Sequence, residues 1–362
     1  MSHRFARMAI IVLVVAAFFM LPQPVLAGTP DDTYTIERYY AQAADLQQTR
    51  STTLGAAVTL TFIPPSTKDF VIIASALVNN ESTSYYTQTT LDINTVDYSD
   101  SYNRPVDTAN NWVSFGSHKV ITCIGGQTQT IKIEYCSEID TSYAYIKRAS
   151  IIALEVLEDG DNNCVNIESN IESENSTTSY VPKVTLTFTP PEQQDYLLLA
   201  TANLSNSGVK KATLVQLTQD TISTGGYEHE EDIYSSCGSA AVIENLSADQ
   251  HVFAIEFASE STSYTALIKD ARITAIPMAD LADPGLYQYE GVEAASENIT
   301  TTYADKTTMS LVTATRGDWL IIPMALGKNE STTASFYSRL NIDGTLCDEF
   351  AFKPVARTNN RN

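Results

Sequence analysis

Apolar and polar residues alternate along much of the chain with a period of two. Residues 58–63 place Val, Leu and Phe at every second position with Thr between them, and residues 87–93 alternate in the same way. Residues 70–78 form a more continuous apolar run. Alternation rich in β-branched residues is typical of half-buried strands, and a short continuous apolar run is typical of a strand in the middle of a sheet. The pattern therefore predicts β structure.

Further strands are predicted downstream in the same unit. Two glycines separate residues 119–124 from residues 128–136, which predicts a hairpin because glycine readily adopts positive φ. Residues 112–115 predict a weak strand and residues 143–157 a long final one. No segment after residue 27 keeps a 3.6-residue apolar period over a helix-like length. About eight strands in about 120 residues predict an all-β fold, an antiparallel β-sandwich of jelly-roll type, although strand number alone leaves the topology open.

The unit is repeated along the chain. Each copy has an alternating stretch, a turn, an Asp followed by an aromatic residue, and an apolar run. The alternating stretches are residues 58–65, 184–191 and 307–314, at offsets of 126 and 249. Repeats at a fixed period indicate tandem units of one architecture. We therefore expect repeat one at residues 35–157, repeat two at residues 158–280, and repeat three at residues 281–362.

Repeat three lacks a counterpart of the last part of repeat one, since Asn362 aligns with Val113. One interpretation is that the sequence is incomplete. The other is a natural half-domain completed by strands from a partner chain, in the manner of donor-strand pairing. A half sandwich would expose open sheet edges, and this cost favours the first interpretation.

The N-terminus has the pattern of a secretory signal peptide. Arg4 and Arg7 precede an apolar run over residues 9–21, and small residues follow near Ala27. We expect residues 1–27 to be a cleaved signal peptide, residues 28–34 to be a linker, and the protein to be extracellular or on the cell surface. The apolar run is short for a membrane span, and no membrane span is expected in the mature chain.

Charge narrows the set of partners. The chain of 362 residues has 43 acidic and 22 basic residues, which give a net charge of −21. Phosphate binding requires clustered Lys and Arg, so we expect no nucleic acid partner. Four His and five Cys offer little for a His-based metal site or a disulfide framework. The sequence contains no nucleophile elbow, metal-ligand His pair or phosphate loop, and we expect no enzyme.

Ser/Thr runs that end in Tyr recur in all three repeats. In an antiparallel sandwich the loops after odd-numbered strands share one end, so these runs are expected to form a tip on each repeat. Tyrosine rings and hydroxyl groups suit neutral polar ligands such as glycans. The alternative is that these loops are ordinary solvated loops whose tyrosines cover the core. The candidate ligand-binding residues are Tyr85, Tyr143, Tyr180, Tyr264 and Tyr303.

Two further patterns suggest chemistry. Asp159, Asp161 and Asn163 resemble the start of a calcium loop, but the later EF-hand positions do not fit; an inter-repeat calcium site and a solvated linker both remain as interpretations. No other cofactor is expected. Six Asn-x-Ser/Thr sequons occur, and four of them adjoin the Ser/Thr runs. These four candidate glycosylation sites are Asn80, Asn175, Asn298 and Asn329.

The repeats favour a structural or adhesive role over catalysis. The first hypothesis is a secreted or cell-surface stalk, fibre or adhesin, whose organisation resembles bacterial adhesin and fibre repeats in general terms. The alternative is a multi-module carbohydrate-binding protein that uses the Ser/Thr/Tyr tips. An extracellular glycoside hydrolase is a third and weaker hypothesis, since it needs only two carboxylates. Expected partners are glycans or copies of the chain itself.

Overall fold

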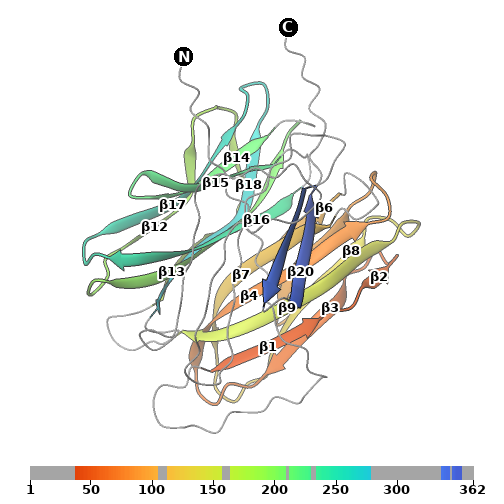
Figure 1. Cartoon of the computed structure of the whole chain (residues 1–362), viewed down its shortest axis with the longest axis horizontal. Coiled ribbons are helices and arrows are strands. Elements are labelled where there is room, and N and C mark those ends of the chain that lie inside the picture. The colour runs from red at the N-terminus through yellow and green to blue at the C-terminus, as the bar shows by residue number, and fades with distance from the viewer. Residues whose placement is uncertain are drawn as a thin grey trace.

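The computed structural model describes residues 37–104, 112–156, 164–208, 212–229, 234–278, 336–342 and 345–352. The described residues form antiparallel strands arranged as two sandwiches and a separate hairpin (Figure 1). The strands of repeat one are β1 (Arg38–Ala43), β2 (Gln47–Thr49), β3 (Gly55–Phe62), β4 (Lys68–Asn80), β5 (Thr87–Ile93), β6 (Val96–Asn103), β7 (Val113–Cys123), β8 (Gln129–Ser137) and β9 (Ala144–Val156).

The strand order of repeat one is that of a jelly roll. One sheet has the order β1-β9-β4-β7, with β2 continuing β1 beside β9, and the other has the order β3-β8-β5-β6. If β1 and β2 count as one interrupted strand, successive strands alternate between the two sheets except at the β5–β6 hairpin. This arrangement confirms the predicted antiparallel sandwich and supplies the topology that the strand count left open.

Repeat two has the same arrangement. Its sheets have the orders β10-β18-β13-β16, with β11 beside β18, and β12-β17-β14-β15. The strands are β10 (Val165–Ser169), β11 (Ser173–Asn175), β12 (Val181–Phe188), β13 (Gln194–Asn206), β14 (Thr213–Gln219), β15 (Ile222–His229), β16 (Ser235–Leu246), β17 (His251–Ser259) and β18 (Ala266–Pro277). Strands β10–β18 therefore have the same sheet assignment and the same order within each sheet as β1–β9.

Each sandwich has its own core, built by the alternation seen in the sequence. In β4, Phe70, Ile72 and Ala74 point into the core of repeat one, where Phe70 packs against Tyr39 and Phe62. The intervening residues Val71 and Ile73 are also buried, but they belong to a different apolar cluster. The continuous apolar run of β4 therefore reflects a strand covered on both faces.

The second face of β4 is covered by repeat two. Sheet β1-β9-β4-β7 packs face to face against sheet β10-β18-β13-β16, so the two sandwiches lie side by side (Figure 1), and the edge strand β6 of the other sheet also contacts repeat two. The shared apolar cluster contains Val71, Ile73 and Val156 from repeat one, and Leu197, Leu199, Ala240, Ile276 and Met278 from repeat two. The two repeats therefore form one body through a buried apolar interface.

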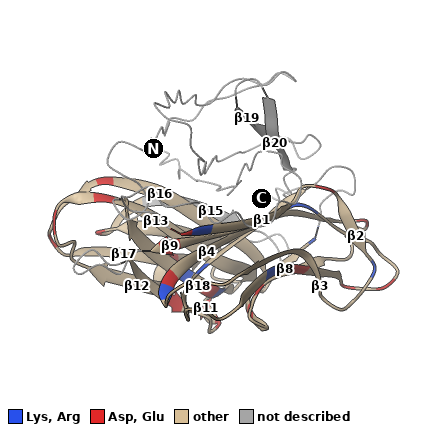
Figure 2. Ribbon diagram, turned by 90° about the horizontal axis from the view of Figure 1, so that it is seen from below, with Lys and Arg blue, Asp and Glu red and all other residues tan. Residues whose placement is uncertain are grey.

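Polar groups border this interface. Arg272 of β18 is 2% exposed, and its Nε lies 3.3 Å from Glu168 Oε2 while its guanidinium also donates to the Tyr98 carbonyl of repeat one. Lys119 of β7 forms an ion pair with the same Glu168. Although burial alone would raise it, these two cations hold the pKa of Glu168 below its usual value. Figure 2 shows residues of both charges close together around β11 and β18.

One histidine is buried between the repeats. His118 of β7 is 2% exposed; its Nδ1 lies 3.0 Å from Thr201 Oγ1 and its Nε2 lies 3.0 Å from Thr274 Oγ1. Burial, together with Arg272 and Lys119, lowers the pKa of His118 to about 3. The imidazole is therefore neutral at physiological pH and links β7 to two strands of repeat two.

Strand β6 was not among the predicted elements. It is an edge strand of repeat one, and residues of repeat two bind along it: Tyr102 N donates to Tyr234 O, and Ser236 N donates to Ser101 Oγ.

Residues 112–124, predicted as two strands, are mostly one strand, β7. No disulfide joins the four cysteines among the described residues, Cys123, Cys136, Cys164 and Cys237.

In repeat three the structure describes one antiparallel hairpin, β19 (Phe336–Ile342) and β20 (Thr345–Phe352). At the sequence offset of 249, these strands align with β5 and β6 of repeat one. The hairpin therefore has the place in repeat three that β5–β6 has in repeat one.

Candidate functional site

Three loops converge at one end of repeat one. They are the β2–β3, β4–β5 and β8–β9 loops, and main-chain hydrogen bonds join them: Glu81 N donates to Tyr143 O, and Ser137 N donates to Ser51 O. The fully buried Asn80 organises this end, because its Oδ1 accepts from Ser82 N at 3.0 Å and from Ser142 Oγ at 2.7 Å. The Ser/Thr/Tyr loops of repeat one thus meet in space; we call them tip one.

Tip one presents an aromatic ring beside an exposed ion pair. The Arg50 guanidinium lies 3.8 Å from the centroid of the Tyr143 ring, and the Tyr145 ring is 6.0 Å away. Arg50 and Glu81 are 4.0 Å apart and each is about half exposed. Tyr85 is partly buried in the β4–β5 loop. The arrangement offers a tyrosine ring, cationic donors and carboxylate acceptors on one surface.

The equivalent loops of repeat two, which we call tip two, are joined in the same way. Ser207 N donates to Thr265 O, and Ser259 N donates to Thr177 O. Tyr264 lies directly over Gly208, where a Cβ would come within 2.0 Å of the tyrosine ring. Tyr180 is 40% exposed at the start of β12. One face of Tyr264 is therefore covered by backbone, whereas Tyr180 is open to solvent.

The contact between Tyr264 and Gly208 leads to a prediction. Gly208→Ala is expected to displace the ring and lower the free energy of unfolding by about 1–3 kcal/mol, the usual cost of overpacking. Gly55→Ala is the matched control, since a Cβ there meets nothing within 4 Å. Chemical denaturation of both variants measures the difference. Equal stability of the two variants would contradict the packing of Tyr264 on Gly208.

Burial argues against two of the four predicted sequons. Asn80 is 0% exposed and its Nδ2 donates to Tyr86 O; Asn175 is 6% exposed and its Nδ2 donates to Ser179 O and Phe257 O. A glycan attached to either Nδ2 would replace these buried hydrogen bonds, and the folded chain has no room for it. The remaining predicted residues lie outside the described residues: Tyr303, Asn298 and Asn329, and the candidate calcium ligands Asp159, Asp161 and Asn163.

A group of carboxylates that no sequence pattern revealed lies on the outer face of repeat one. Two cross-strand rows run over β6, β5 and β8: Asp97, Asp92 and Lys132 form one row, and Asp100, Thr90 and Glu134 form the other. Leu91 and Ile133, next to these positions, point into the core, so the two rows face away from it. We call these six residues the acidic face. The three strands bring together residues from positions 90–134, which no local spacing would reveal.

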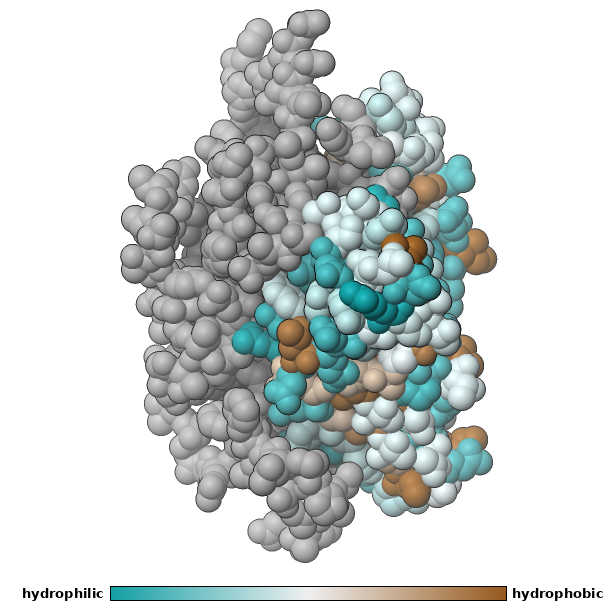
Figure 3. All heavy atoms as spheres, turned by 90° about the vertical axis from the view of Figure 1, so that its right-hand side faces the viewer, coloured by the Kyte–Doolittle hydropathy of each residue, from teal (hydrophilic) through white to brown (hydrophobic). Residues whose placement is uncertain are grey.

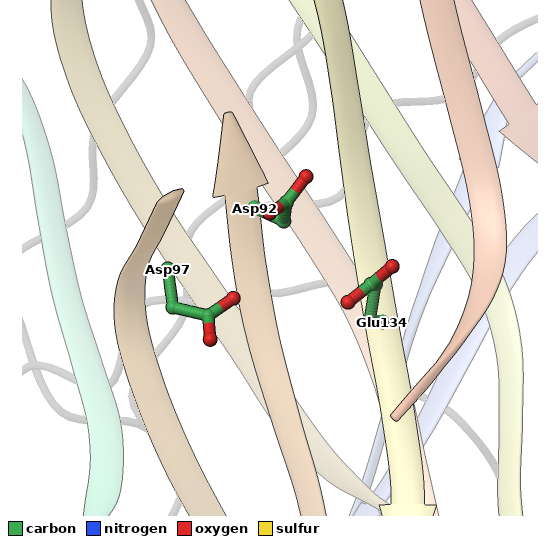
Figure 4. Close-up of side chains that lie close together, drawn as sticks. All are labelled: Asp92, Asp97 and Glu134. Carbon is green, nitrogen blue, oxygen red and sulfur yellow. The ribbon is translucent and has the colours of Figure 1, made fainter. Parts of the chain in front are cut away.

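Carboxylates on the acidic face lie close together. Asp92, Asp97 and Glu134 each offer an oxygen within 4.8 Å of the others (Figure 4). Lys132 Nζ lies 3.4 Å from Asp92 Oδ1 and 3.1 Å from Glu134 Oε1. Burial and the charges of Asp100, Asp92 and Glu134 raise the pKa of Asp97, with Lys132 acting in the opposite direction. The local charge is therefore negative despite the lysine.

Comparisons with known proteins identify no family. No family model matches the chain, and no curated protein matches it. Solved structures overlap it only weakly. The tandem CBM22-1-CBM22-2 domain of Paenibacillus barcinonensis Xyn10C has 10% identity and a TM-score of 0.23, with 69% of this chain and 100% of that chain covered. A T13 particle structure of infectious bursal disease virus has 8% identity and a TM-score of 0.27, with 70% and 73% covered.

A third similar structure is the insecticidal delta-endotoxin Cry8Ea1 of Bacillus thuringiensis, at 7% identity and a TM-score of 0.23. The match covers 67% of this chain but only 52% of the toxin, so the chain spans about half the toxin's length. Similarities at this level do not place the chain in a family.

The described surface has no dominant apolar area in the view of Figure 3, where apolar residues occur as small groups among polar ones. The large exposed apolar side chains come from separate elements, for example Tyr40 of β1 and Ile222 of β15. Among the described residues, no helix has the length and apolar character needed to cross a membrane.

Proposed function

We propose that this chain is a secreted or cell-surface adhesin-type binding protein that recognises neutral glycans through tip one. The observation that carries the proposal is the convergence of three loops that hold the Tyr143 ring beside Arg50 and Glu81. Sugar rings present apolar C–H faces and many hydroxyl groups. A tyrosine ring can stack on the former, while guanidinium and carboxylate groups can bond to the latter.

Secretion is supported by the signal-like residues 1–27. The net charge of −21 disfavours polyanionic ligands, which the protein would repel, and leaves neutral glycans as the better candidates. The proposal assigns no catalytic step to the chain.

The packing of the two repeats favours a binding body over an extended stalk. A stalk gains length when successive repeats join end to end, whereas here the sheets of repeats one and two pack face to face. Side-by-side packing shortens the molecule and holds tip one on a rigid support. Rigid support reduces the entropy lost on binding.

Titration of the full chain against a panel of neutral oligosaccharides tests the proposal. We expect saturable binding that Tyr143→Ala weakens by about tenfold, since one aromatic contact contributes on the order of 1 kcal/mol. Arg50→Gln should weaken the same binding. Tyr40→Ala is the matched control, because Tyr40 is 63% exposed on β1 and lies outside tip one. Absence of saturable binding, or binding that Tyr143→Ala and Tyr40→Ala affect equally, would overturn the proposal.

A further inference from the structure

The acidic face of repeat one carries more negative charge than its single lysine balances. Asp92, Asp97, Asp100 and Glu134 share this face with Lys132, which pairs with Asp92 and Glu134. Asp92 is 4% exposed, so its carboxylate is largely removed from water. A buried carboxylate beside others is costly unless a cation compensates the charge. Lys132 pairs with Asp92 and Glu134, so the four carboxylates keep a net negative charge that this one ammonium does not neutralise.

A second observation comes from Thr90. Its side chain is 0% exposed, and its Oγ1 has no hydrogen-bond partner. Thr90 pairs across strands with Asp100 on one side and Glu134 on the other, so its hydroxyl lies on the acidic face between two carboxyl-bearing residues. Asp100 Oδ1 is also buried without a hydrogen-bond partner. Buried oxygens are rarely left without a hydrogen-bond partner. Here two such oxygens belong to cross-strand neighbours on the acidic face.

The equivalent positions of repeat two hold different residues, most of them uncharged. Leu217 pairs with Ile255 as Leu91 pairs with Ile133, so Gln216 takes the place of Thr90. Gln216 donates to Glu256, the counterpart of Glu134, at 2.7 Å. Thr218 and Ala254 replace Asp92 and Lys132. The acidic face of repeat one is therefore not repeated at the equivalent positions of β14 and β17 in repeat two, and the sandwich common to both repeats does not require it.

We propose that the acidic face binds a calcium ion, with Asp92, Asp97 and Glu134 as its carboxylate ligands. The hydroxyl of Thr90 and the free oxygen of Asp100 lie in the adjacent row, where they can bind the ion directly or through its waters. All the donors are oxygens, which hard cations prefer. Calcium accepts six to eight oxygens in flexible geometry, and this suits side chains spread over three strands better than the strict octahedron of magnesium.

The Lys132 ammonium competes with the calcium ion for the carboxylates of Asp92 and Glu134. Its ammonium holds Asp92 and Glu134, and its side chain is 26% exposed at the end of a flexible stem. Calcium entry would move the ammonium outward into solvent. Removal of the lysine charge should therefore tighten calcium binding, whereas removal of a carboxylate should weaken it.

Calcium titration of the full chain by calorimetry, with the melting temperature as a second readout, tests the proposal. We expect one saturable site with a Kd of about 0.1–1 mM, as in extracellular modules, and a higher melting temperature in calcium. Asp97→Asn, at an exposed position that tolerates substitution, should weaken binding by about tenfold or more. Lys132→Gln should tighten binding several-fold. Magnesium at equal concentration should bind more weakly.

The matched control is Glu256→Gln in repeat two, which occupies the place of Glu134 and should leave calcium binding unchanged. Absence of a saturable site up to about 20 mM calcium, well above the range of extracellular modules, would overturn the proposal. Binding that Asp97→Asn and Glu256→Gln change equally would overturn it as well, because it would show diffuse attraction to an acidic protein. Both outcomes are independent of glycan binding at tip one.

Discussion

Leu199→Asp is expected to lower the free energy of unfolding by about 4 kcal/mol or more, and to separate the two repeats. Leu199 is 3% exposed and lies in the apolar cluster shared by repeats one and two, close to Val71 and Ile73. The substitution loses the burial of a leucine side chain, about 2 kcal/mol, and places a carboxylate without a partner in an apolar interface. The chain can hydrate that carboxylate only by opening the interface.

Calorimetry and small-angle scattering check this result. The variant should melt at a lower temperature, and its radius of gyration should increase as the sandwiches separate. Ile222→Asp is the matched control: Ile222 is 72% exposed on β15, and a charge there should change stability by no more than about 0.5 kcal/mol. If Leu199→Asp kept both the melting temperature and the radius of gyration of the unmodified chain, the face-to-face interface would be wrong.

His118→Gln is expected to remove a large part of the pH dependence of stability. Burial lowers the pKa of His118 to about 3 in the folded chain, whereas an unfolded histidine titrates near 6.5. Between these values the unfolded chain binds one more proton than the folded chain. The stabilisation from the neutral imidazole is therefore complete above about pH 6.5 and is lost as the pH falls, by about 1.4 kcal/mol per pH unit.

The measurement is the free energy of unfolding of both chains at pH 7.5 and pH 4. Glutamine loses hydrogen-bonding capacity between Thr201 and Thr274, so the variant should be the less stable chain at pH 7.5. At pH 4 the difference should shift in the variant's favour by about 3 kcal/mol. Carboxylates titrate in both chains and cancel in the comparison. A stability difference that is independent of pH would show that His118 is not buried in its neutral form.

Strand β6 illustrates why part of the fold escaped sequence analysis. Residues 96–103 are mostly Asp, Ser, Tyr and Asn, without the apolar alternation that predicts a strand. The turn before β6 is also atypical. Asn94 and Thr95 both have positive φ, at 53° and 71°, in a two-residue hairpin where glycine usually supplies one of these positions. Tyr102 N donates a hydrogen bond to repeat two and Ser101 Oγ accepts one from it, and these two bonds complete the pairing along this edge.

The two candidate sites also differ in how far the sequence could predict them. Tip one could be located from the sequence, because its loops follow alternate strands and antiparallel strands return each of them to the same end. The covering of Tyr143 by Arg50 could not, since those residues meet only after β2 and β9 pair. The acidic face was missed because its residues are spread over positions 90–134 and become neighbours only through the register of three strands.

The amino-acid sequence by itself predicted the antiparallel β-sandwich repeats and, from alternation, strands such as β3 and β5. These predictions depend on local alternation and on similarity between copies, and both can be seen in the sequence alone. The tertiary structure alone decided that the repeats lie side by side, that β6 is a strand and that carboxylates gather on one outer face. The continuous apolar runs of β4 and β13 were compatible with any cover on their second face. Only the tertiary structure shows which element packs on that second face, because contacts between distant segments depend on how the two sheets are placed relative to each other.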